Sequence, residues 1–106
     1  MSSNNKELWI ALAHVEQLAR GGTLGDSDRA YVNVMGSAIS RADFRRQIKK
    51  AVESLELVLL RVENPEPLEM RLSKHSIHRD LSKLAKKLQK TGELGFGVFH
   101  AYDLNT

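Results

Sequence analysis

Two halves of the chain, roughly residues 31–63 and 68–103, carry the same succession of hydrophobic patterns. The first half opens with a stretch at 30–36 that is rich in β-branched and aromatic residues. Apolar residues at helical spacing follow Ser40, and a nearly continuous apolar run occupies 57–62. These patterns predict a strand, a helix and a second strand that is buried on both faces.

The second half repeats this order after a break at Asn64-Pro65-Glu66-Pro67, which is predicted to be a rigid turn because proline cannot donate to a strand ladder. Apolar and polar residues alternate at 68–72, as in a half-exposed strand. A helix is expected to begin near Ser73 or Ser76 and to end before Gly92. Alternation at 94–102 predicts the last strand.

A helix over residues 5–20 is predicted to precede these halves. Asn4 and Glu7 have the spacing of a capping box, and Gly21-Gly22 is a typical stop signal. Apolar residues from Leu8 to Ala19 recur at helical spacing. Trp9 and Ile10 lie off this stripe, so they are expected to make a second apolar contact, with the chain's own sheet or with another chain.

The order strand, helix, strand, strand, helix, strand is that of the split βαβ motif. The sequence therefore predicts an α+β fold, a ferredoxin-like βαββαβ sandwich preceded by an extra N-terminal helix. Residues 1–106 would form a single domain, with the helix at 5–20 and the core at 30–103. Right-handed crossovers would place both core helices on one face of a four-stranded antiparallel sheet, with the N-terminal helix over the other face.

The chain contains no cysteine, which excludes disulfides, thiolate metal sites and cysteine nucleophiles. No apolar stretch approaches the length of a membrane span, and no cationic segment leads into an apolar run at the N-terminus. A cytoplasmic location is the expectation from these features.

The net charge of +3 is unevenly distributed. Residues 41–90 contain 13 Lys and Arg against 7 Asp and Glu. The excess falls on the two predicted core helices, whose basic residues are Arg45, Arg46, Lys49, Lys50, Lys83, Lys86, Lys87 and Lys90. Such residues either form a solvated outer surface or attract phosphate groups, and the second interpretation makes nucleic acid a possible partner.

The segment Gly95-Phe96-Gly97-Val98-Phe99 resembles the longer ribonucleoprotein motif of RNA-recognition domains. The resemblance implies a βαββαβ fold that stacks RNA bases on sheet aromatics. The sequence departs from the motif because Leu94 replaces the basic residue, and because Val98 and Phe99 are transposed. The alternative interpretation is a strand whose glycines allow another element to pack closely.

Signals for catalysis are weak. No P-loop lysine, dinucleotide-binding glycine pattern or nucleophile elbow is present, so no catalytic residue and no cofactor are assigned. His75, His78 and His100, with Glu66 or Glu69, are weak candidates for a metal site with nitrogen and oxygen ligands.

Three function classes follow. The leading hypothesis is a non-enzymatic binding protein that acts through protein–protein contacts, as an adaptor, as an antitoxin-like or immunity-like masking protein, or as a homodimer. Its candidate partner-binding residues are Trp9 and Ile10, with the carboxylates of Glu63, Glu66 and Glu69 around the stiff turn. The first alternative is a nucleic-acid-binding domain that uses the two basic helices. The second is a small-molecule-binding or catalytic ferredoxin-like domain.

Overall fold

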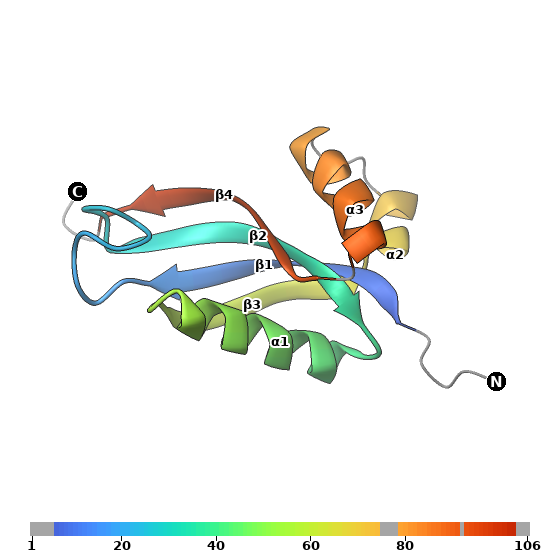
Figure 1. The fold of residues 1–106 in the computed structure, drawn as a ribbon, viewed down its shortest axis with the longest axis horizontal. Coiled ribbons are helices and arrows are strands. Elements are labelled where there is room, and N and C mark those ends of the chain that lie inside the picture. The colour runs from blue at the N-terminus through green and yellow to red at the C-terminus, as the bar shows by residue number, and fades with distance from the viewer. Residues whose placement is uncertain (1–5, 75–78, 92, 104–106) are drawn as a thin grey trace.

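The computed structural model describes residues 6–74, 79–91 and 93–103. Within these ranges the chain forms a four-stranded antiparallel sheet with the strand order β3-β1-β2-β4, together with three helices (Figure 1). The elements in chain order are β1 (Glu7–Glu16), β2 (Arg29–Ala38), α1 (Arg41–Ser54), β3 (Val58–Pro67), α2 (Leu68–Lys74), α3 (Arg79–Thr91) and β4 (Gly95–Tyr102).

The predicted N-terminal helix is wrong, because these residues form strand β1 in the interior of the sheet. β1 pairs with β2 on one side and with β3 on the other, and both of its faces are covered around Trp9 and Ile10. Trp9, Ala11, Ala13 and Val15 point to one face, and Ile10 points to the other. A strand buried on both faces has apolar residues at successive positions, and such a run also satisfies helical spacing.

β1 and β2 form a long hairpin whose loop is held by the side chain of Gln17. Its Nε2 donates to the carbonyl oxygens of Gly25 and Ser27, at 2.9 and 3.1 Å. Its Oε1 accepts from the N–H of Leu24 at 2.9 Å. These three bonds satisfy a buried amide side chain and place the start of β2 beside the end of β1.

The predicted turn at Pro65 and Pro67 and the predicted strand at 68–72 are also wrong. Both prolines belong to β3, and residues 68–74 form helix α2. β3 tolerates the prolines because it is an edge strand and because its pairing with β1 shifts in register next to them. A second shift leaves Leu60 as an extra, exposed residue, so β3 is not the doubly buried strand that its apolar run predicted.

Helix α1 confirms the sequence prediction. The Ser40 hydroxyl accepts from the N–H of Asp43 as the N-cap, and the carboxylate of Asp43 accepts from the N–H of Ile39, the residue before the cap. Phe44, Ile48 and Val52 are buried, as their spacing predicts. The last strand is confirmed as β4, and the last helix is confirmed over Arg79–Thr91.

The ferredoxin-like prediction is contradicted by the element order ββαβααβ and by the strand order. The helices also lie on both sides of the sheet (Figure 1). We call the side covered by α1 the α1 face, and its core contains Phe44, Ile48 and Val52. We call the opposite side the α3 face, where α2 and α3 pack on Ile10 and Met35.

The observed class is therefore α+β, with a four-stranded antiparallel sheet between two helical layers. No helix in the described part of the chain is long and apolar enough to cross a bilayer.

Candidate functional site

The α3 face is open over much of its length, because α2 and α3 cover the end of the sheet that contains Ile10, Met35 and Gly95. Directly paired residues of an antiparallel sheet share a face, so the register shows which side chains occupy the open part. One row across the sheet consists of Arg61, His14, Tyr31 and His100. The next row, farther from α3, consists of Glu16, Arg29 and Tyr102.

Three rings from these rows form what we call the aromatic cluster: His14, Tyr31 and Tyr102. The imidazole of His14 stacks on Tyr31 with ring centroids 4.2 Å apart and 5° between the planes. Tyr102 lies 6.0 Å from both other rings, centroid to centroid. Nε2 of His14 lies 2.6 Å from the Tyr102 hydroxyl oxygen, so the rings are held by a hydrogen bond as well as by stacking.

The polar groups of the cluster form a short chain of interactions. Glu16 Oε2 accepts from Nε of Arg29 at 3.4 Å, and Arg29 is directly paired with Tyr102 across β2 and β4. Burial lowers the pKa of His14 below its ordinary value, and the positive charge of Arg29 lowers it further. His14 is therefore neutral at pH 7.

A groove of about 650 Å³ lies between α3 and the β2–β4 part of the sheet. Asn33, Phe96 and Gly97 line it from the sheet, and Leu81 and Leu84 line it from α3. Lys83, Lys87 and His100 are exposed at its rim. Since His100 pairs directly with Tyr31, the groove continues into the aromatic cluster, and the two form one surface.

Two glycines of β4 explain why α3 can lie so close to the sheet. A Cβ atom on Gly97 would lie 3.2 Å from Cδ2 of Leu81, and one on Gly95 would lie 2.9 Å from Cδ1 of Leu84. The interpretation of these glycines as positions of close packing is therefore confirmed. The base-stacking role that the RNA-motif resemblance implies for Phe96 and Phe99 is not supported, because both rings pack against the α1-face core, 5.7 Å apart.

Trp9 and Ile10, predicted to contact a partner, lie inside the protein. Trp9 is 8% exposed and packs against Phe44, with ring centroids 6.0 Å apart. Ile10 is fully buried under α2 and α3. Their position off a helical stripe was the reason to expect a partner contact, and that reason disappears because the segment is a strand.

The three carboxylates predicted to surround a hairpin tip are not gathered at one. Glu63 and Glu66 lie on β3, and Glu69 is exposed on α2. Glu66 forms ion pairs with Arg71 and Lys74, with a distance of 3.1 Å to Lys74 Nζ. The hydrogen bond from Arg71, and then that from Lys74, lowers the pKa of Glu66. Glu66 is thus engaged within its own chain.

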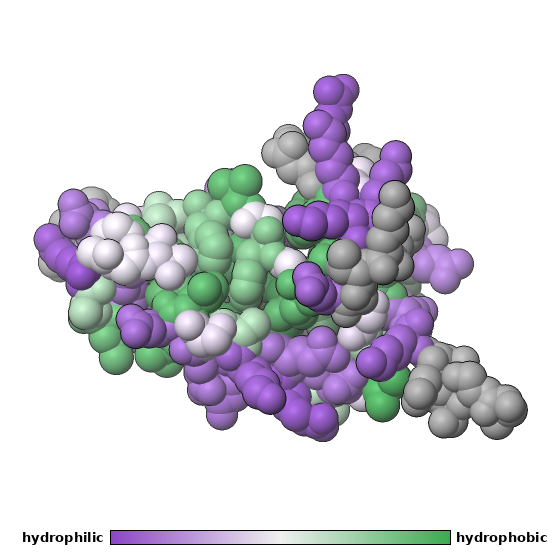
Figure 2. All heavy atoms as spheres, viewed as in Figure 1, coloured by the Kyte–Doolittle hydropathy of each residue, from purple (hydrophilic) through white to green (hydrophobic). Residues whose placement is uncertain are grey.

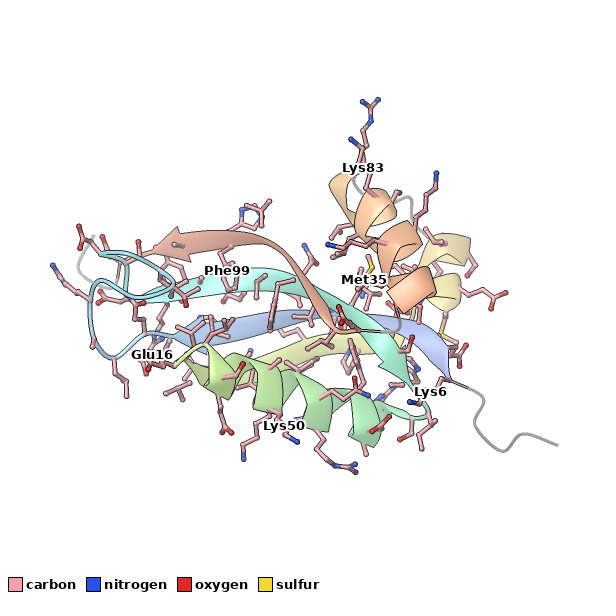
Figure 3. All side chains as sticks on the ribbon, in the orientation of Figure 1. Lys6, Glu16, Met35, Lys50, Lys83 and Phe99 are labelled. Atoms are coloured by element: carbon pink, nitrogen blue, oxygen red, sulfur yellow. The ribbon has the colours of Figure 1, made fainter. Side chains whose placement is uncertain are left out.

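The basic residues of the two helices do not form one surface. Arg45, Arg46, Lys49 and Lys50 are exposed on α1, on the opposite side of the sheet from Lys83, Lys86 and Lys87 of α3 (Figure 3). The side chain of Lys90 lies outside the described residues. Among the basic residues predicted from sequence, the groove is lined by Lys83 and Lys87.

The weak metal candidates are not brought together in the described part of the chain. His75 and His78 lie outside the described residues, and His100 is at the rim of the groove. No group of three or more His, Asp or Glu side chains suited to a metal occurs among the residues with described positions.

The sequence reasoning missed His14, Arg29 and Tyr102, which hold the aromatic cluster together. The reason is that His14 was placed on a helix, where it could not face Tyr31 across a hairpin. A strand predicted over Glu7–Glu16 and paired with β2 in a hairpin would have placed the rings of His14 and Tyr31 on one face of the sheet.

In comparisons with known proteins, no protein-family model, no curated protein and no solved structure matches this chain.

Proposed function

We propose that this protein binds single-stranded nucleic acid on the open part of the α3 face. The observation that carries the proposal is the continuity between a lysine-rimmed groove and a stacked aromatic cluster. The sequence hypothesis of a protein partner ranks below it, because Trp9 and Ile10 are buried and Glu66 is paired within the chain.

The groove has the chemistry that an unpaired nucleotide requires. Leu81, Leu84 and Val98 supply apolar contacts for the flat surface of a base. The amide of Asn33 offers both a donor and an acceptor to a base edge. Bases of a duplex are stacked and paired inside the helix, so this use of the groove favours a single strand.

The charge at the rim is suited to phosphate. Lys83 and Lys87 are four residues apart on α3, so they lie on the same side of the helix, and both are exposed. Arg61 is exposed in the row that contains His14 and Tyr31, whereas Arg29 is neutralised by Glu16. A strand that runs from the groove across the cluster would therefore contact positive charge at both ends of its path.

Fluorescence anisotropy with labelled oligonucleotides of about 12 nucleotides tests the proposal. The double variant K83E/K87E is expected to weaken binding at least about tenfold, because it reverses both charges at the groove. The matched control is K49E/K50E, which makes the same change of charge on the opposite side of the sheet and is expected to leave most of the affinity.

Salt dependence gives a second readout of the same binding. With three phosphates neutralised on a single strand, by Lys83, Lys87 and Arg61, the logarithm of the affinity should fall against the logarithm of salt concentration with a slope of about −2.1. Absence of binding in low salt, equal losses in the two double variants, or a preference for duplex over single strand would each overturn the proposal.

A further inference from the structure

We propose that two copies of this chain associate through the outer edges of their β4 strands, which join the two sheets into one. The proposal rests on the backbone edge of β4, a strand whose Val98 and His100 also line the groove, and it stands without the nucleic-acid proposal.

The two edges of the sheet differ in how well they are protected against pairing. β3 carries Pro65 and Pro67 together with Arg61, Glu63 and Glu66, all of which discourage a further strand. β4 contains neither a proline nor an Asp, Glu, Lys or Arg residue. Its one pairing among the described residues is with β2, and it forms the rim of the sheet in Figure 1.

The side chains of β4 also lack a covering element on the α1 face. Helix α1 packs against β3, β1 and β2 but does not reach β4. Phe96 and Phe99 are consequently only partly buried. On the opposite face of the same strand, Val98 lines the groove and is 61% exposed. Apolar residues are gathered over the middle of the molecule, between the hydrophilic residues of α1 and of α3, in Figure 2. Phe99 itself is labelled below β4 in Figure 3.

A second copy fits this edge because the edge is complementary to itself. Identical strands related by a two-fold axis run antiparallel, and no like-charged Asp, Glu, Lys or Arg side chains would be placed opposite each other. A partner with a charged edge would gain no ion pair from β4, whereas a second β4 supplies apolar side chains.

The position of the two-fold axis follows from the register of β4. Its pairing with β2 is irregular between Phe96 and Phe99 and regular from Phe99 to Tyr102. An axis at His100 pairs Phe99 with Ala101 of the second copy, and both positions belong to the α1 face. The same axis places the exposed Val98 beside Tyr102 of the second copy and the two His100 side chains opposite each other.

This arrangement has a consequence for the α3 face. A two-fold axis perpendicular to the sheet leaves the α3 faces of both copies on the same side. The two grooves would then lie on one continuous eight-stranded surface, on either side of the paired His100 residues. Each β4 strand contributes only about five residues to this interface, so little area is buried. The dissociation constant of the dimer is therefore expected to be on the order of micromolar.

Sedimentation velocity of the full chain from about 1 to about 200 µM tests the association. The wild-type mass is expected to rise with concentration from 11.9 kDa towards twice that value. H100K alone and H100E alone should remain monomeric, because each places like charges opposite each other at the axis. An equimolar mixture of H100K and H100E should form a dimer, since the two charges are then opposite in sign.

The matched control is L60K, which adds the same charge at an exposed position on the other edge strand and should still form a dimer. His100 is exposed, so these variants are expected to fold, and circular dichroism verifies it. A wild-type chain that stays monomeric throughout, single His100 variants that still form dimers, or loss of the dimer in L60K would each overturn the proposal.

Discussion

Trp9 illustrates how one side chain can serve either a core or a binding surface, depending on the backbone beneath it. On β1 it lies against Phe44 of α1 and belongs to the α1-face core. Its indole Nε1 is buried and has no hydrogen-bond partner among the described residues. The ring therefore contributes through its apolar area and its aromatic contact.

Replacement of Trp9 by alanine is expected to lower the free energy of unfolding by about 3–5 kcal/mol, because it leaves a cavity beside Phe44. Trp9→Phe should cost less, since it keeps an aromatic ring and removes the buried N–H. Urea unfolding followed by circular dichroism measures both values. A fully stable Trp9→Ala variant would contradict the core position and return Trp9 to the candidates for partner binding.

The protonation of His14 makes the stability of the folded chain depend on pH. Its pKa is lowered from the ordinary value of 6.5 by burial and then by Arg29, so the unfolded chain binds a proton more readily than the folded chain. The stabilisation that results is present above pH 6.5 and is lost as the pH falls from there towards the lowered pKa.

The free energy of unfolding is therefore expected to decrease as the pH falls below 6.5, and to decrease less in His14→Gln. Urea titrations at a series of pH values measure this difference. Equal slopes in wild type and His14→Gln would show that His14 does not set the dependence.

The position of helix α3 depends on how closely the helix approaches β4, where it packs against glycines. A Cβ atom on Gly95 would lie within 3.2 Å of both methyl carbons of Leu88, which is buried, as well as close to Leu84. The position of the helix, and with it the width of the groove, is thus determined by glycines on the facing strand.

Gly95→Val is expected to displace α3 and to lower the free energy of unfolding by about 1–3 kcal/mol, through overpacking against Leu84 and Leu88. Hydrogen exchange should show faster exchange in α3, with α1 unchanged on the other face. The control is Ala101→Val, at an exposed position of the same strand. Equal loss of protection in α1 and α3 would contradict a local effect on the groove.

The molecule as a whole is elongated, with principal extents of 51 × 26 × 21 Å, and the sheet separates its two helical layers. The basic residues of α1 and α3 are consequently presented on opposite sides, and a single bound strand on the α3 face would contact the α3 lysines. The layered arrangement is also the reason why charge reversal on α1 is a matched control for charge reversal on α3.

Local sequence signals predicted those elements whose hydrophobic pattern fits only one type of secondary structure. Ser40 and Asp43 mark the start of α1, and the buried residues of α1 recur at helical spacing. Alternation predicted β4, and its glycines predicted close packing. The basic character of α3 was also visible, and two of its lysines line the groove.

Only the tertiary structure decided the state of residues 7–16, because their apolar run satisfies the spacing of a helix and of a doubly buried strand equally well. Pairing with β2 and β3 selects the strand, and that choice buries Trp9 and brings His14 to Tyr31. It also changes the topology, so that the helices are divided between the two faces. The sequence alone thus determined the local periodicity of each segment. The site depends on contacts between residues as far apart as His14 and Tyr102, and local periodicity does not encode such contacts.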